Sequence, residues 1–370
     1  MKHAFYISSF VLYLLLVSFT TNQKTLKDAY KQKFLIGAAI NTNISSEKDM
    51  ASVQILQQHF NSIVAENCMK SEKLQPREGK FFFDEADEFV AFGEKNNFWI
   101  VGHCLVWHSQ APRWFFFDEQ RNEVSREVLL ARLKNHITTV VSRYKGKVHG
   151  WDVVNEAIME DGSWRNSPFY SIIGPDFVDS AFVWAHQADP DTELYYNDYN
   201  MANEGKRNTV VKLVKHLKDN GIRIDAVGMQ GHLHLDYPVF YEFEKSIKAF
   251  ANTGAKVMIT ELDISVLPRA KANVGADVSL NFEYQQKLNP FTEGLTNEVD
   301  SAFTNRYIDF FALLLRNSDA ISRVTTWGVT DNDTWLNNWP IRGRKDYPLL
   351  FDRNYQAKPV VNKIIDEINR

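Results

Sequence analysis

The chain has 370 residues, of which 44% are hydrophobic, 24% charged and 13% aromatic, and its formal net charge is −4. These fractions are typical of a soluble globular protein and exclude a disordered chain, a fibrous repeat and a multi-pass membrane protein. Basic residues (42 Lys and Arg) do not outnumber acidic ones (46 Asp and Glu), which argues against nucleic acid as the main partner. Two cysteines, Cys68 and Cys104, are too few for a disulfide framework or a four-cysteine zinc site. Because each stands in an apolar, strand-like run, we expect two buried free thiols.

The first 22 residues differ from the rest of the chain. Lys2 precedes an uncharged apolar run over residues 10–17, and small polar residues follow it. This layout is typical of a secretory signal, and the run is shorter than the ~20 apolar residues of a transmembrane helix. We therefore expect residues 1–22 to export the protein, to the medium, the periplasm or the cell surface, and residues 23–370 to form a single domain. A buried first helix is the alternative.

From residue 24 onward, short β-rich runs alternate with helical stretches, and no linker or internal repeat divides the chain. The predicted strands cover Phe34–Ile40, Ser62–Glu66, Trp99–Trp107, Val148–Val154, Leu194–Asn197, Ala226–Gln230, Val257–Thr260 and Val324–Trp327. Apolar residues at helical spacing predict one helix that begins after Ser125 and another that ends at Asn220-Gly221. A last helix is expected at Ile364–Ile368. This alternation predicts an α/β fold, a single (β/α)8 TIM barrel, with an elaborated loop after strand 7 from Leu267 to Asp300.

Polar residues cluster where most of the predicted strands end. These clusters are Glu66-Asn67, His103 with Trp107-His108, Asn155-Glu156, Asn197-Asp198, Gln230-Gly231-His232, Glu261-Leu262-Asp263, and Trp327 followed by Asp331. A single cluster would only mark the end of a strand. Because catalytic groups of such barrels gather at the carboxyl ends of the strands, the repeated placement predicts one shared site.

Two of these clusters place a carboxylate directly after an apolar strand. Glu156 follows the run from Trp151, and Glu261 follows Val257–Thr260. Hydrolysis of a glycosidic bond needs two carboxyl groups, one to protonate the leaving oxygen and one to attack the anomeric carbon or activate water. Two glutamates on non-adjacent strands could face each other across a sugar. The alternative is that both are held in ion pairs at the rim.

The ordered set of motifs resembles glycoside hydrolase family 10, the endo-β-1,4-xylanases, from about Leu26 to Ile368. The matching segments are Ala65-Glu66-Asn67 with Met69-Lys70, Gly102-His103, Trp107 to Gln110, Trp151 to Ala157, Tyr196 to Tyr199, Val227-Gly228 with Gln230 and His232, Ile259 to Asp263, and Thr326-Trp327-Gly328. The resemblance implies a retaining enzyme whose partners are xylan and xylo-oligosaccharides. We expect no cofactor, no metal, no nucleic acid, no membrane association beyond the export segment, and a monomer.

The same resemblance assigns the chemistry to the two glutamates. Glu156 resembles the general acid/base and Glu261 the nucleophile, so Glu156 must be protonated and Glu261 ionised when substrate binds. Asn155 resembles the amide that binds the 2-hydroxyl of the sugar at the cleavage point. His232 resembles a residue that orients the nucleophile and keeps it ionised, with Asp263 as its charge partner; a histidine satisfied in the core is the alternative.

The remaining matches concern substrate. Glu66, Asn67 and Lys70 resemble the polar contacts of a glycone sugar, and His103 resembles a hydroxyl ligand at the adjacent subsite. Further supporting residues are Gln110, at the end of its motif, and Gln230, which we expect to contact substrate or Glu261.

Aromatic residues form the other half of the expected site, because the C–H faces of sugars pack on aromatic rings. Trp107, Trp327 and Trp335 resemble a cage around the glycone sugars, and Tyr196 resembles an aromatic residue on the leaving-group side. We expect Trp151 in the core, and Trp339 is ambiguous.

Three other interpretations stay open at the level of sequence. Paired glutamates would also suit a retaining cellulase or mannanase. The histidines of His232-Leu233-His234 and His103 prompt a metal-dependent hydrolase, although the three or four convergent ligands of a zinc site are not evident. The third is a xylan-binding protein without activity, which the presence of both glutamates disfavours.

Overall fold

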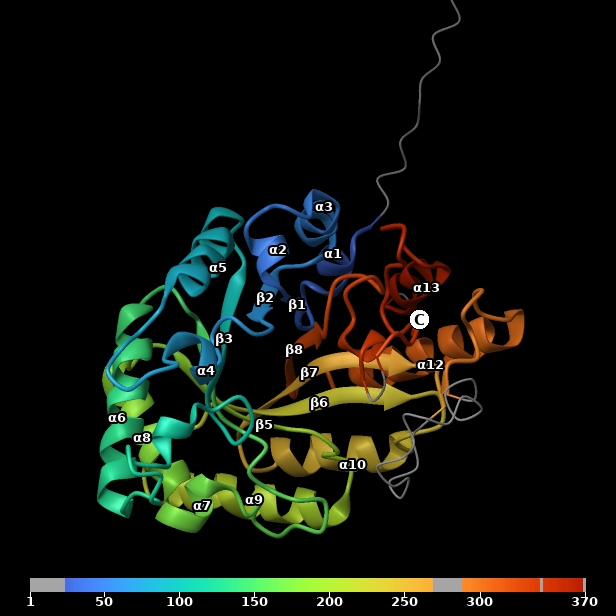
Figure 1. Cartoon of the computed structure of the whole chain (residues 1–370). Coiled ribbons are helices and arrows are strands. Elements are labelled where there is room, and N and C mark those ends of the chain that lie inside the picture. The colour runs from blue at the N-terminus through green and yellow to red at the C-terminus, as the bar shows by residue number, and fades with distance from the viewer. Residues whose placement is uncertain (1–23, 269–287, 340–341, 369–370) are drawn as a thin grey trace, which may run out of the picture.

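The computed structural model describes residues 24–268, 288–339 and 342–368. Parallel strands close into a barrel in the order β1-β2-β3-β4-β5-β6-β7-β8, and helices surround it (Figure 1). The strands are β1 (Leu35–Ile40), β2 (Ser62–Ala65), β3 (Trp99–Trp107), β4 (Gly150–Asn155), β5 (Glu193–Asp198), β6 (Ala226–His234), β7 (Lys256–Ser265) and β8 (Ile321–Thr326). The predicted (β/α)8 barrel is therefore confirmed.

The helices cover the outside of the barrel and include short turns in the loops. The α-helices are α1 (Leu26–Tyr30), α2 (Thr42–Ser45), α3 (Met50–His59), α4 (Ser71–Leu74), α5 (Asp84–Lys95), α6 (Arg126–Arg143), α7 (Pro168–Ile173), α8 (Phe177–Ala188), α9 (Glu204–Asp219), α10 (Phe240–Ala251), α12 (Asn297–Arg316) and α13 (Pro359–Glu367). Two 3-10 turns are η1 (Arg113–Phe115) and η3 (Trp335–Asn337). Within the described residues, no helix is both long enough and apolar enough to cross a membrane.

Local signals in the sequence place the helix ends that were expected. The Ser125 side chain accepts a hydrogen bond from the Val128 N–H and so caps α6. Asn220 ends α9, and Gly221 follows with a φ of 70°, in the left-handed region that favours glycine.

Strands buried on both faces explain the apolar runs in the sequence. Every residue of β4 is buried, as parallel strands between barrel interior and helices must be. Trp151 of β4 is buried in the core, as expected. A Cβ at Gly102 of β3 would stand 2.1 Å from the Trp151 ring, so this pairing of strands needs glycine there. Cys68 and Cys104 are both buried and free, which confirms that expectation.

Two strands extend further than the sequence pattern predicted. β6 continues to His234 and β7 to Ser265, and their pairing resumes beyond a register irregularity with His232 opposite Asp263. Between these pairs β7 has one more residue than β6, and polar residues follow the apolar runs on which the prediction depended. As a result, His232, Glu261 and Asp263 lie within strands rather than after them.

Two predicted boundaries near the C-terminus were wrong. The predicted loop after strand 7 was extended to Asp300, but α12 already begins at Asn297, because the Thr296 side chain accepts from the Val299 N–H and caps the helix. The last helix begins at Pro359 rather than Ile364, since proline is well suited to the first turn. Residues 269–287 of the predicted loop, like the expected export segment, lie outside the described residues.

Candidate active site

Both sequence-predicted glutamates lie at the carboxyl end of the barrel. Glu156 directly follows β4, and Glu261 lies in β7. Each has left-handed backbone geometry, with φ of 60° for Glu156 and 54° for Glu261. Residues other than glycine adopt this geometry at a cost and keep it where neighbouring contacts fix it, which is common at functional sites. Both residues that the chemistry needs therefore have an unusual backbone conformation, as does Gln110 of the same rim, with a φ of 48°.

Glu156 is surrounded by neutral hydrogen-bond donors. The Trp107 indole Nε1 donates to Oε2 at 2.8 Å. The Gln230 and Asn155 amides donate to Oε1 at 3.1 and 3.3 Å. These donors come from β3, β6 and β4, so three strands fix the direction of one partly exposed carboxyl group.

Glu261 has a different environment, because one of its donors is charged. Its carboxyl group is nearly buried, and the Asn197 amide donates to Oε1 at 2.8 Å. The His232 imidazole Nε2 lies 3.1 Å from Oε2, and its Nδ1 lies 3.0 Å from Asp263 Oδ2. Burial would lower the pKa of His232, but the carboxylates of Asp263 and Glu261 outweigh it and raise that pKa to about 10. His232 is therefore an imidazolium at neutral pH, and it donates to both carboxylates.

The chain of contacts continues to an aromatic residue of the rim. The Trp335 indole Nε1 donates to Asp263 Oδ2 at 2.8 Å, and the Trp335 and His232 rings lie 5.0 Å apart. Trp335, Asp263 and His232 thus form one hydrogen-bonded series that ends at Glu261. The structure therefore places His232 next to Glu261 and Asp263 next to His232, and their roles stay a prediction.

Sequence reasoning missed a buried amide that links the two glutamates. Asn197 of β5 donates from Nδ2 to both Glu261 Oε1 and Asn155 Oδ1, at 2.8 and 2.9 Å. Its Oδ1 accepts from the Thr260 hydroxyl at 2.6 Å. A Cβ at Gly228 would stand 2.4 Å from that oxygen, so the neighbouring strand leaves room for the amide. The signal was present, since Asn197 ends its strand in the polar cluster, but its chemistry alone did not distinguish it.

The Asn155 side chain is buried within this network. Its Oδ1 also accepts from Gln230 Nε2 at 3.2 Å. The two amides therefore lie where they orient Glu156.

A second polar group lies at the ends of β2 and β3. Lys70 Nζ donates to Asn67 Oδ1 and to Gln110 Oε1, each at 2.9 Å, and Asn67 Nδ2 donates to Glu66 Oε1 at 3.2 Å. Lys70 is only 6% exposed, so it is a fixed cation rather than a solvated surface lysine. Burial raises the pKa of Glu66, and the Lys70 ammonium partly offsets that rise. Lys70 also lies 4.9 Å from the centre of the Trp107 ring, which connects this group to Glu156.

Aromatic residues line the same end of the barrel. The Trp327 ring lies 5.3 Å from that of His103, and 6.4 Å from that of His232. His103 is buried, with Nδ1 2.9 Å from Asp152 Oδ2. Trp335 stacks against Trp339, whose ring is 60% exposed, with centres 6.5 Å apart and planes inclined by 22°. The structure therefore brings the three predicted tryptophans close to the glutamates, with Trp339 next to them.

The expectation for Tyr196 was wrong. Its side chain has no exposed surface, and its hydroxyl donates to Asp198 Oδ2 at 2.5 Å, so its ring cannot contact a sugar. Alternation along β5 is the reason, because Tyr196 and Asn197 point to opposite sides and Asn197 faces the glutamates. Tyr199, which comes after the end of the strand, does keep exposed surface and was not singled out.

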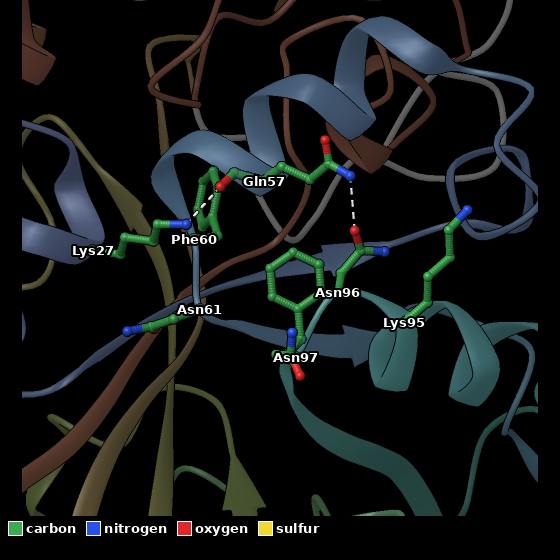
Figure 2. Close-up of a pocket in the computed structure, with 8 residues that line it drawn as sticks. Lys27, Gln57, Phe60, Asn61, Lys95, Asn96 and Asn97 are labelled. Atoms are coloured by element: carbon green, nitrogen blue, oxygen red, sulfur yellow. Dashed lines mark hydrogen bonds between the residues drawn. The ribbon is translucent and has the colours of Figure 1, made fainter.

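A separate hollow of about 400 Å³ lies at the opposite end of the barrel (Figure 2). Its lining includes Asn61 and Phe98, which directly precede β2 and β3. Polar groups there bind one another: Lys27 Nζ donates to the Gln57 carbonyl at 2.5 Å, and Gln57 Nε2 donates to Asn96 Oδ1 at 2.7 Å. The hollow contains neither candidate glutamate, so we place the chemistry at the other rim. Among the described residues, no group of three or more His, Cys, Asp or Glu side chains could hold a metal ion.

The fold and this rim define a barrel glycosidase with a pair of glutamates. A sequence model described as Glycosyl hydrolase family 10 matches residues 25–367. Endo-1,4-beta-xylanase A of Xylanibacter ruminicola is 52% identical over 344 residues, which cover 93% of this chain and 93% of that protein. Endo-1,4-beta-xylanase of Geobacillus stearothermophilus is 42% identical over 349 residues, covering 92% and 98%. A solved GH10 endoxylanase retrieved from sugarcane soil metagenome superposes with a TM-score of 0.87 at 43% identity, covering 93% and 99%. This chain belongs to glycosyl hydrolase family 10.

Proposed function

We propose that this protein is an endo-β-1,4-xylanase that hydrolyses internal bonds of xylan with retention of anomeric configuration. The observation that carries the assignment of roles is the difference between the two glutamates. Glu261 is nearly buried and accepts from the His232 imidazolium and the Asn197 amide, which hold its carboxyl group in one direction for attack. Glu156 is partly exposed and accepts from the neutral side chains of Trp107, Asn155 and Gln230, which leaves its carboxyl group within reach of a leaving oxygen.

In the first step, the Glu261 carboxylate attacks the anomeric carbon of a xylose unit. A C–O bond forms to Glu261 while the glycosidic C–O bond breaks, and Glu156 gives its proton to the departing oxygen. The His232 imidazolium and the Asn197 amide fix the direction of the attacking carboxylate. Asn155, whose amide donates to Glu156, is proposed to bind the sugar hydroxyl next to the reacting carbon.

In the second step, Glu156 is a carboxylate and acts as a base. It takes a proton from water as the water oxygen bonds to the anomeric carbon, and the ester bond to Glu261 breaks. The product sugar leaves with its original configuration, Glu156 is protonated again and Glu261 is ionised again.

The polar group around Lys70 supports a neutral, hydroxyl-rich substrate. Its amide and carboxylate partners offer donors and acceptors to the edge of a sugar, while Trp327 and Trp335 offer faces to the ring. Xylose lacks the hydroxymethyl group of glucose and mannose, so a crowded aromatic rim favours it. We further propose that the enzyme is exported through residues 1–22 and acts as a monomer; N-terminal sequencing of the secreted product and sedimentation analysis test these two points.

A time course on plain xylan, arabinose-decorated xylan, carboxymethyl-cellulose and mannan tests the function. Short xylo-oligosaccharides of several lengths are expected early, with little product from the other two backbones. If xylose or xylobiose is the sole product from the outset, that result contradicts internal cleavage. Glu261→Ala is expected to abolish activity, while Glu298→Gln, in the first turn of α12, serves as a matched control that keeps it. Full activity of Glu261→Ala would overturn the assignment of the nucleophile.

A further inference from the structure

The backbone that follows Glu156 is held by side chains at three successive residues. Arg165 Nε donates to the Glu156 carbonyl oxygen at 2.8 Å. The Ala157 N–H donates to the Tyr196 hydroxyl oxygen at 3.2 Å, and the Ile158 N–H donates to Asp198 Oδ2 at 3.3 Å. The segment that carries the proposed acid/base is therefore fixed through its peptide groups as well as through the Glu156 side chain.

The groups that hold this segment form a buried assembly behind it. Tyr196, Asp198 and Lys206 have no exposed surface. Lys206 Nζ donates to Asp198 Oδ1 at 2.9 Å, which provides the counter-charge for the buried carboxylate. The Tyr196 hydroxyl donates to Asp198 Oδ2, so its proton points away from Ala157 and a lone pair is left to accept from the Ala157 N–H. Burial raises the pKa of Tyr196 well above its usual value, so this hydroxyl stays protonated.

Arg165 is fixed by the same assembly. Its Nη2 donates to the Tyr199 hydroxyl at 2.7 Å, and its own N–H donates to the Ala157 carbonyl oxygen at 2.8 Å. The Tyr199 ring in turn has the Lys206 ammonium 3.9 Å from its centre. Arg165 and Tyr196 therefore approach residues 156–158 from two sides of one connected set of side chains.

This arrangement matters because Glu156 has left-handed backbone geometry, which a free strand end would not keep. A general acid must lie within hydrogen-bond reach of the leaving oxygen, and small displacements are costly for rate. We propose that Tyr196 and Arg165 are positioning residues for the acid/base, which hold the Glu156–Ile158 backbone so that the Glu156 carboxyl group meets the glycosidic oxygen. The proposal rests on the proposed role of Glu156.

Substrates that differ in leaving group separate this role from general damage. Departure of a xylose oxygen needs a proton from Glu156, whereas departure of 2,4-dinitrophenolate does not. Loss of positioning should therefore slow cleavage of xylohexaose far more than the first step on 2,4-dinitrophenyl β-xylobioside. In the second step Glu156 acts as base, and azide can replace water because azide needs no deprotonation.

The test uses Tyr196→Phe and Arg165→Lys in the full chain, with Tyr30→Phe as the matched control. Tyr30 is also fully buried and its hydroxyl donates to a backbone carbonyl, that of Ile364, at 2.6 Å. For the two test variants, we expect kcat/KM on xylohexaose to fall about tenfold more than kcat/KM on the dinitrophenyl substrate. Azide should raise the turnover of the dinitrophenyl substrate by the two test variants and yield β-xylobiosyl azide. Tyr30→Phe should change kcat/KM equally for both substrates and give no azide product.

Trapping with 2,4-dinitrophenyl 2-deoxy-2-fluoro-β-xylobioside counts correctly folded sites, because it requires Glu261 and not the acid. Equal losses on the two substrates per trapped site, or no loss at all, would overturn the positioning role. Glu156→Ala in parallel tests the premise. If Glu156→Ala loses no more kcat/KM on xylohexaose than on the dinitrophenyl substrate, the proposed role of Glu156 fails. If Glu156→Ala shows this extra loss and the two test variants do not, only the positioning role fails.

Discussion

Replacement of Asp263 by asparagine tests whether His232 is held as an imidazolium beside the nucleophile. Asp263→Asn removes a charge but keeps the size of a buried side chain, whose Oδ2 accepts from His232 Nδ1 and Trp335 Nε1. Asp263 contributes more than Glu261 to the raised pKa of His232. The substitution therefore removes the main stabilisation of the imidazolium and leaves the Glu261 contact in place.

The stabilisation of the imidazolium follows from the ordinary pKa of His232 and its pKa in the folded protein. A rise in the pKa of His232 from 6.5 to about 10 corresponds to about 5 kcal/mol in favour of the charged form. Loss of one adjacent carboxylate typically lowers such a pKa by about 2, which is worth about 3 kcal/mol. Because the folded pKa is raised, the stability that His232 contributes is complete below pH 6.5 and is lost as pH rises through about 10. In Asp263→Asn, we expect the pKa of His232 to be about 2 lower than in the wild type. The stability that His232 contributes should then be lost as pH rises through about 8.

Imidazole nitrogen resonances followed by NMR from about pH 5 to about pH 11 measure the titration directly. His232→Gln assigns the signal, and urea unfolding across the same range measures the stability. The wild-type ring should stay protonated through neutral pH, with the variant titrating at lower pH. A wild-type His232 that titrates near its ordinary pKa would refute the reasoning, as would an unchanged pKa in Asp263→Asn.

Three other variants test further contacts. Lys206→Met should lower the free energy of unfolding in urea by about 3–5 kcal/mol, since it leaves Asp198 buried and unpaired. Burial raises the pKa of Asp198 to about 6 even with Lys206 present, and loss of the ammonium raises that pKa further, so the loss of stability should be small below pH 6, where the carboxyl group binds a proton in both proteins, and should grow as pH rises above about 6; equal losses at all pH values would contradict this. Gly228→Ala forces a Cβ to 2.4 Å from the Asn197 oxygen, and kcat/KM should fall about 100-fold; unchanged kinetics would show that this amide does not position the nucleophile. Trp339→Ala removes an exposed ring, so the free energy of unfolding should change by less than about 0.5 kcal/mol, while KM for long xylo-oligosaccharides should rise. An unchanged KM would mean that the ring does not contact substrate.

Much of the fold and the position of the site could be predicted from the sequence. Buried parallel strands leave apolar runs, and turn residues and caps such as Ser125 mark helix ends, so the alternation of elements is visible without structure. The carboxyl ends of barrel strands converge, so Glu156 and Glu261 could be placed at one rim from their positions after apolar runs.

Prediction failed where a contact between distant segments decided the outcome. Tyr196 and Asn197 are neighbours in one motif, and sequence alone did not show which of them faces the substrate. The structure places Asn197 against Glu261 and buries Tyr196 against Asp198. The extension of β6 and β7 past the rim was also missed, because their pairing depends on an irregular register.

The sequence by itself determined the barrel, the rim and the two glutamates, because apolar periodicity and residue order are local properties of the chain. Only the tertiary structure decided what surrounds each carboxylate. His232 becomes a cation because Asp263 and Glu261 lie on both sides of it, and Glu156 keeps its left-handed geometry while Arg165 and Tyr196 hold the backbone. Charge and orientation depend on neighbours in space, and those neighbours come from different strands and loops.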